Sequence, residues 1–346
     1  MSILPLIYII ITVAFIDTFS QLPIIAPFSS SLGASPMLVG IIIGLYSFSN
    51  ILGNIVSGFW IDRIGPKKVL SVGMLSVGVI LFFYSVAANP QQLVIIRFLH
   101  GFAGGLIVPA AFTFLGTMKT EKSKGKVMAF SGASVGAAAV IGPAIGAIIS
   151  GRFGYNWLFY FITVIILVFA ILAMIFTKEQ LSDKKSLVPQ ESKPLSITRA
   201  LIYAYISIFS LLFTLGILTF ALPVKVDELN LSSELTGPLL SVFGIVAILF
   251  FILPTNRLYD RMKNMQLMTI GLITISLALL GLSLSATFLH LLFAMTVYGI
   301  GFACFSRQQV QPLLKVPETV NAEKPLGCFM HASLLELLSV LLVQVF

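Results

Sequence analysis

Charged residues, cysteine and histidine are all scarce in this sequence, and each scarcity excludes a class of protein. Only 10% of the 346 residues are charged, whereas about a quarter are charged in soluble globular domains, so an ordinary soluble protein is excluded. Two cysteines and three histidines follow no metal-ligand spacing: Cys304, Cys328, His100, His290 and His331. We therefore expect no metal site and no cofactor. The sequence also has no paired carboxylates and no nucleophile beside a base, so we do not expect an enzyme.

Long apolar runs dominate the chain. Hydrophobic residues make up 58% of it, and the mean hydropathy is +1.04. Ten runs have roughly the 20 residues of a bilayer-spanning helix: Ile3–Phe28, Met37–Trp60, Val69–Ala88, Leu93–Met118, Val127–Ser150, Trp157–Phe176, Ala200–Pro223, Gly237–Pro254, Met265–Ala286 and Phe288–Phe305. We expect an all-α polytopic membrane protein whose main partner is the lipid bilayer. The first run has no basic start and no small-residue cleavage site, so we expect it to remain as a helix.

Basic residues outnumber acidic ones and give a net charge of +8. They gather in short loops between the apolar runs, at residues 62–68, 119–126, 178–193 and 257–263. The loops at 29–36 and 87–92 carry no charge, and Arg152 and Lys225 are isolated exceptions on the same side. Because basic loops stay in the cytoplasm, the charge indicates membrane topology and not nucleic acid as a partner. We expect a multi-pass protein of the cell membrane with a cytoplasmic N-terminus.

A compact charged motif lies between the second and third runs. Its characteristic residues are Gly58, Asp62, Arg63, Gly65, Lys67 and Lys68. It resembles the loop between the second and third helices of the major facilitator superfamily, where glycine, three residues, aspartate, arginine, one residue and glycine precede basic residues. Pro66 and Trp60 depart from the usual pattern. The alternative is an ordinary cytoplasmic turn, which also favours Gly, Pro and Lys. The resemblance implies a latch at the cytoplasmic gate of a transporter.

A degenerate copy of this motif lies at Asn256–Lys263 and keeps aspartate followed by arginine. Six apolar runs precede the longest polar stretch and four follow it. The resemblance implies the fold of the superfamily, two six-helix halves related by a pseudo-two-fold axis, and this superfamily is itself the standard example of such repeats. The expected parts are residues 1–177 as the first half, 178–199 as a cytoplasmic linker, 200–305 as helices seven to ten of an incomplete second half, and 306–346 as an atypical tail.

One acidic residue lies deep inside the first apolar run. An aspartate such as Asp17 costs about 2.5–3.5 kcal/mol near the bilayer centre on insertion scales, so it is rarely accidental. Gln21 lies one turn further along the same face. Arg97 in the fourth run is the expected countercharge, and with His100 and Gly101 it resembles the fourth-helix motif of the superfamily. In that superfamily the arginine is implicated in proton transfer, and ionisable residues inside the membrane mark ion pathways by default, so we expect Asp17 and Arg97 to couple transport to protons. The alternative is that Arg97 snorkels to the outer interface.

The fifth run carries small residues at helical spacing around a proline. Ala138, Gly142, Pro143 and Gly146 resemble a motif associated with antiporters of the superfamily, including proton-driven drug exporters, with alanine at its first glycine. The alternative is a generic small-residue packing face. The resemblance favours export as the direction of transport.

Two asparagines in the second run, Asn50 and Asn54, are also one turn apart. They either line a transport cavity together with Gln21 or form hydrogen bonds with neighbouring helices, and we favour the second role.

The tail after Phe305 does not fit a twelve-helix pattern. Residues 307–331 are polar and patternless, and the final apolar run, Leu334–Phe346, is too short to span a bilayer. Read from the third base of each codon, the tail permits a sequence that resembles the start of the superfamily's eleventh helix. We expect a lost base near Ser306. Coincidence through codon degeneracy is the alternative.

The resemblance implies a monomeric, proton-coupled exporter of drugs or small metabolites that works by alternating access. In this hypothesis Asp17 exchanges the proton, Arg97 stabilises its charge, and a cationic drug competes for the ionised carboxylate. Two alternatives stay open: an inactive truncated remnant, and a facilitator that moves its substrate without protons. The residues identify no particular substrate.

Overall fold

The computed structural model describes residues 4–117, 124–177, 199–252 and 264–314, and every element in these ranges is helical. The helices of the first half are α1 (Leu4–Gln21), α2 (Ile25–Ser31), α3 (Pro36–Ile64), α4 (Pro66–Tyr84), α5 (Pro90–Thr117), α6 (Lys124–Phe153) and α7 (Tyr155–Phe176). The second half contains α8 (Arg199–Glu228), the 3-10 helix η2 (Ser233–Leu235), α9 (Thr236–Ile252), α11 (Asn264–Ser283) and α12 (Phe288–Leu314).

Nine helices within the described ranges are long and apolar enough to cross a membrane. They correspond to nine of the predicted runs, and the remaining run, Ala200–Pro223, falls within α8. The prediction of an all-α polytopic membrane protein is therefore confirmed. The predicted linker, the second copy of the charged motif and most of the tail lie outside the described residues.

The first apolar run does not form one helix, so the expectation of a single helix over Ile3–Phe28 is wrong. α1 ends at Gln21, and α2 begins at Ile25 after a short turn. Pro23 has no N–H to donate, and its ring would clash with the preceding turn of a continuing helix. Pro27 is tolerated because it lies in the first turn of α2. The last run also differs, since α12 continues past Phe305 to Leu314.

Gly65 makes the sharp turn inside the charged motif. Its φ of 86° lies in the left-handed region that favours glycine. Its N–H donates to the carbonyl of Ile61 over 2.9 Å and closes the end of α3, and Pro66 then starts α4 at the position where proline is best tolerated in a helix. Gly58, Asp62, Arg63 and Lys68 are exposed here, and Lys67 is half-buried.

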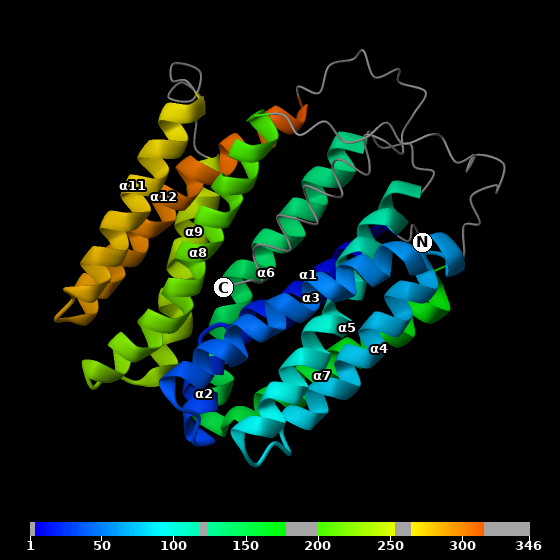
Figure 1. Cartoon of the computed structure of the whole chain (residues 1–346), viewed down its shortest axis with the longest axis horizontal. Coiled ribbons are helices and arrows are strands. Elements are labelled where there is room, and N and C mark those ends of the chain that lie inside the picture. Colours follow the sequence, from blue (N-terminus) through cyan, green and yellow to red (C-terminus); the bar gives the residue numbers. More distant parts are fainter. Residues whose placement is uncertain (1–3, 118–123, 178–198, 253–263, 315–346) are drawn as a thin grey trace.

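The helices form two groups that meet at α6. In Figure 1, α8, α9, α11 and α12 lie together on one side, and α1, α3, α4, α5 and α7 lie on the other. α6 packs against α1 and α7 of its own half and against α9 of the other. Each group has its own buried apolar core. This arrangement agrees with two halves, each with a separate core.

The two halves meet near the end of the bundle that holds α2 and η2. Gly237 of α9 lies so close to the Pro143 carbonyl of α6 that a methyl group would overlap it. Ser241 donates a hydrogen bond to the Val140 carbonyl over 2.6 Å. At the end of α6, Arg152 Nε lies 3.7 Å from a Glu234 carboxylate oxygen of η2. These contacts hold the halves together at one end.

Candidate functional site

A group of buried polar side chains lies between the first five helices, and we call it the polar cluster. Its members are Asp17 and Gln21 of α1, Tyr46 of α3, Tyr84 of α4, and Arg97 and His100 of α5. All six are buried, with exposed fractions of 6% or less. Helical periodicity places the two residues of α1 on one face of that helix and the two residues of α5 on another. Buried charges require partners, and the structure provides them as follows.

Asp17 has a hydrogen-bond partner on each carboxylate oxygen. Its Oδ2 lies 3.0 Å from His100 Nε2. Its Oδ1 accepts a hydrogen bond from the Gln21 side-chain amide over 2.7 Å. A buried carboxylate with these contacts is satisfied on both oxygens.

His100 is bonded through both ring nitrogens. The Tyr84 hydroxyl lies 2.9 Å from its Nδ1, while Nε2 faces Asp17. The imidazole also packs edge-on against the Tyr46 ring, with centroids 5.0 Å apart. His100 is completely buried, and its ring nitrogens are satisfied by protein partners, as expected of a buried polar group.

Arg97 reaches the carboxylate only indirectly. Its Nη1 donates to the Gln21 side-chain carbonyl over 2.7 Å and to the Tyr84 hydroxyl over 3.3 Å. Its guanidinium carbon lies 4.5 Å from the centre of the Tyr46 ring, a distance typical of a cation–π contact. Gln21 therefore stands between Arg97 and Asp17. The residue against the carboxylate is His100, where the sequence suggested Arg97.

Close packing of α3 and α5 allows these contacts. A methyl group on Gly101 would overlap the Tyr46 carbonyl, and one on Gly105 would overlap the Asn50 carbonyl. Gly53 of α3 makes the reciprocal approach to the Phe102 carbonyl. Small residues let helix backbones approach closely in membranes. The glycines beside Arg97 and His100 thus bring Tyr46 into contact with both.

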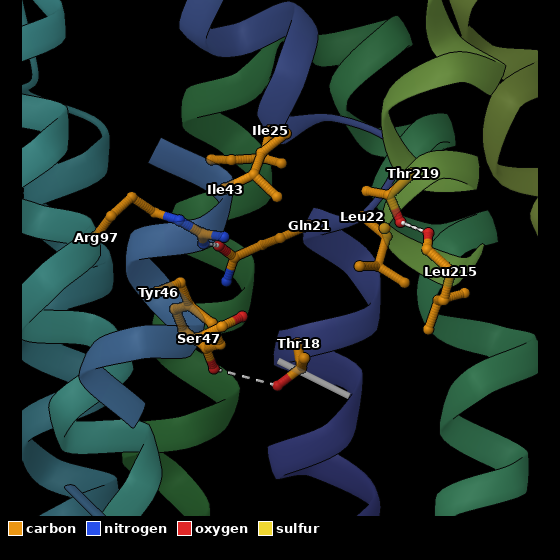
Figure 2. A pocket seen from close by; sticks show the side chains of 11 residues that line it. Thr18, Gln21, Leu22, Ile25, Ile43, Tyr46, Ser47, Arg97, Leu215 and Thr219 are labelled. Carbon is orange, nitrogen blue, oxygen red and sulfur yellow. Dashed lines mark hydrogen bonds between the residues drawn. The ribbon is translucent and has the colours of Figure 1, made fainter. Parts of the chain in front are cut away.

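A cavity of about 40 Å³ lies beside the polar cluster (Figure 2). It is lined by Thr18, Gln21, Leu22, Ile25, Ile43, Tyr46, Ser47, Arg97, Leu215, Gly216 and Thr219. The last three belong to α8, so the cavity lies between the halves. Its volume has room for a few water molecules only. Gln21, Tyr46 and Arg97 face the cavity, whereas Asp17 and His100 are not part of its lining.

The small residues of the fifth apolar run form two contact faces of α6. Gly142 packs against Phe19 of α1, and Gly146 approaches the Ser20 backbone so closely that a methyl group would overlap it. The carbonyl of Pro143 contacts Gly237 in the other half. This stretch of α6 therefore packs against α1 on one side and against the second half on the other.

The remaining predicted residues lie elsewhere. Asn50 and Asn54 are buried, and the Asn54 amide donates to the Asn50 side-chain oxygen over 2.7 Å, outside the cavity lining. The charged motif lies at the opposite end of α3 from α2. Within the described ranges, no group of three His, Cys, Asp or Glu residues could hold a metal ion.

Sequence reasoning missed three members of the polar cluster as functional candidates. His100 was recognised only as part of a motif, although it lies three residues after Arg97 and so shares its face of a helix. Tyr84 and Tyr46 carry no local signal, because a tyrosine in an apolar run is common. Only the packing of α4 and α3 against α5 brings them to the site.

Comparisons with known proteins agree with this architecture. The family model of the Major Facilitator Superfamily matches residues 7–318. Multidrug resistance protein 2 of Bacillus subtilis is 23% identical over 274 residues, covering 76% of this chain and 68% of that protein. The multi-drug resistance efflux pump PmrA of Streptococcus pneumoniae is 30% identical over 141 residues, covering 40% of this chain and 35% of the pump.

The fold is also similar to that of solved structures. A bacterial homologue of the human lysosomal transporter Spinster, in an inward-facing and occupied conformation, superposes with a TM-score of 0.78 at 16% identity. The match covers 99% of this chain and 79% of that one.

Proposed function

The chain belongs to the Major Facilitator Superfamily and is a multi-pass membrane transporter, and from this premise we propose that it exports small molecules across the cell membrane in exchange for protons. Relatives named as multidrug resistance proteins support export as the direction. The small-residue face around Pro143, which resembles an antiporter motif, supports it further.

The observation that carries the proposal is a satisfied buried acid beside a cavity between the halves. Asp17 is 3% exposed and lies in an apolar helix, where an ionisable residue marks an ion or substrate pathway by default. Gln21 and Arg97 connect it to the cavity. A proton bound in the polar cluster therefore changes the charge balance within hydrogen-bond reach of a substrate.

Alternating access supplies the transport step. Substrate binds between the halves, and one half rocks against the other to expose the site to each side in turn. The contacts of Pro143 with Gly237 and of Arg152 with Glu234 close the end that holds α2. We assign that end to the outside, because the basic residues of the charged motif lie at the opposite end and basic loops stay in the cytoplasm.

The charged motif then acts at the cytoplasmic gate. In the described conformation Asp62 and Arg63 are exposed, as expected of a latch that is not engaged. Rocking toward the outward-open state would bring this end of the two halves together. Gly65 fixes the turn that presents the motif.

The structure favours indirect coupling between proton and substrate over direct competition for Asp17. A cationic drug competing directly for the carboxylate would need Asp17 in the cavity lining, and Asp17 is covered by Gln21 and His100 instead. The coupling therefore passes through Gln21 and Arg97, which touch both the cluster and the cavity. In this proposal the substrate binds on the cavity side of Gln21 and Arg97, and the proton binds on their other side, in the polar cluster.

Replacing Asp17 with asparagine tests the proposal. We expect the variant to insert normally but to lose pH-gradient-driven efflux of ethidium from cells, because an amide cannot hold the negative charge on which the cluster is built. Asp227→Asn is the matched control, since Asp227 is an exposed aspartate near the end of α8. Efflux that is driven by the gradient in Asp17→Asn as in wild type would overturn the role of Asp17. Efflux in wild type that ignores the gradient would indicate a facilitator.

A further inference from the structure

His100 is the buried titratable group that the proposed function leaves without a task. It is fully buried, and both of its ring nitrogens have partners. The titratable or charged groups facing it are Asp17 of α1, Tyr46 of α3, Tyr84 of α4, and Arg97 of its own helix. From α7, the apolar ring of Phe159 stacks on Tyr84.

We propose that Nδ1 of His100 is the atom that receives the transported proton, and that Asp17 is the fixed anion that stabilises the resulting imidazolium. The inference rests on the proposed proton coupling and assigns an atom to it. It differs from the simplest expectation, in which the carboxylate itself carries the proton.

The hydrogen-bond pattern of the unloaded cluster follows from the donors and acceptors available. Ionised Asp17 only accepts, so the hydrogen between it and His100 lies on Nε2. A neutral imidazole protonated on Nε2 leaves Nδ1 as an acceptor. The Tyr84 hydroxyl then donates to Nδ1 and accepts from Arg97 Nη1. Every contact in this arrangement has one donor and one acceptor.

An added proton meets different neighbours at each acceptor. Both oxygens of Asp17 already accept from N–H groups, one of Gln21 and one of His100. A proton placed between either oxygen and its donor would face that donor and would break the bond. Nδ1 faces a hydroxyl, which rotates about its C–O bond and accepts instead of donating. The proton therefore lies on Nδ1, and the pattern around Asp17 stays intact.

Loading the proton alters the cavity through Tyr84. The Tyr84 oxygen then accepts from both His100 and Arg97, and the Tyr84 hydroxyl hydrogen turns away from the imidazole of His100. The cluster gains one positive charge, which acts on Arg97 at the cavity wall. Histidine suits this role because its ordinary titration range lies around neutral pH. The proton is released when the outward-facing state gives way to the inward-facing one, and the only bond that forms and breaks is the N–H bond of His100 Nδ1.

NMR of isotope-labelled imidazole nitrogens tests the assignment on the full chain in lipid nanodiscs. The chain has three histidines, so a His290→Gln, His331→Gln background leaves His100 alone. We expect a neutral form protonated on Nε2 at high pH and a doubly protonated form as the pH falls. In the same background, Asp17→Asn should lose the doubly protonated form at the pH where it is present with Asp17. A His100 signal that stays singly protonated throughout the pH range in which efflux responds would overturn the assignment.

A transport experiment separates this inference from the proposed function. His100→Gln offers an amide that donates to Asp17 and accepts from Tyr84 but cannot hold a proton. We expect it to fold and to lose gradient-driven ethidium efflux, while His290→Gln, at the exposed start of α12, behaves as wild type. Driven efflux in His100→Gln equal to wild type would overturn the role of His100 and leave proton coupling standing. Absence of driven efflux in wild type would refute the coupling itself, whatever the NMR spectra show.

Discussion

The two halves place different chemistry between their first and fourth helices. In the first half, Asp17 of α1 contacts His100 of α5, and the cluster around them holds charge. In the second half, Thr214 of α8 lies 3.2 Å from the Tyr298 hydroxyl of α12, a contact between neutral groups. The buried polar residues of the described second half are threonines, serines and Tyr298. A repeated architecture thus carries a charged centre in one copy and a neutral one in the other.

This difference indicates that the two halves have different roles in transport. Buried ionisable groups in a membrane are expensive and persist where they serve a pathway, so the charged centre of the first half is where we propose that the proton binds. The second half supplies an apolar core around Phe243, Tyr298 and Phe305, and the wall of the cavity from α8. We infer that the first half binds the proton and the second half moves against it.

The largest expected effect comes from removing the cation of the charged centre. Arg97→Leu removes the guanidinium that balances Asp17 through Gln21, and leaving a buried charge uncompensated typically costs about 3–5 kcal/mol. We expect a large fall in the free energy of unfolding, measured in detergent, and in the yield of folded protein. Arg152→Leu, which removes an exposed arginine, is the control. Equal stability of the two variants would show that the charged centre is not what holds the first half together.

Close packing predicts an effect that the two halves share. Gly101→Ala forces a methyl group onto the Tyr46 carbonyl, and Gly299→Ala forces one toward the Phe243 carbonyl. Overpacking costs about 1–3 kcal/mol, so both variants should unfold at lower temperature. Gly44→Ala is the control, because a methyl group there meets open space and alanine favours the helix by up to about 1 kcal/mol. Destabilisation of Gly44→Ala to the same degree would contradict the packing argument.

A pair of hydroxyl deletions separates structure from coupling. Tyr84→Phe and Tyr298→Phe each remove a buried hydroxyl that has a partner, and each should cost about 0.5–1.5 kcal/mol of stability. Only Tyr84→Phe removes a contact of His100, so only it should change the pH profile of driven efflux. If the pH profiles of the two variants matched, the hydroxyl of Tyr84 would have no role in coupling beyond that of Tyr298.

The smallest effect on stability is expected at the solvent-exposed ion pair between the halves. Arg152 and Glu234 form an ion pair across the interface, with the arginine side chain 66% exposed. Exposed pairs contribute roughly 0–1 kcal/mol and are screened by salt. A double-mutant cycle with Arg152→Ala and Glu234→Ala should give a small coupling energy that vanishes at high salt. A large coupling energy that survives high salt would mean that this contact controls closure.

Much of the fold and part of the site could be predicted from the sequence. Apolar runs identified the helices, and the motif from Gly58 to Lys68 identified the superfamily before any contact was known. Asp17, Gln21 and Arg97 were also named in advance, because polar residues in apolar runs are conspicuous. The break at Pro23 was missed, since its immediate neighbours Leu22 and Ile24 are apolar and the hydropathy shows no gap there.

The sequence by itself determined which segments cross the membrane and which of them carry polar groups, because hydropathy and helical period depend on neighbouring residues. Tertiary structure decided which polar groups touch. That Gln21 separates Arg97 from Asp17, and that His100 contacts the carboxylate, depends on the rotation and depth of α5 against α1 and α3. Backbone contacts at Gly101 and Gly105 set that position, and their partners lie far away along the chain.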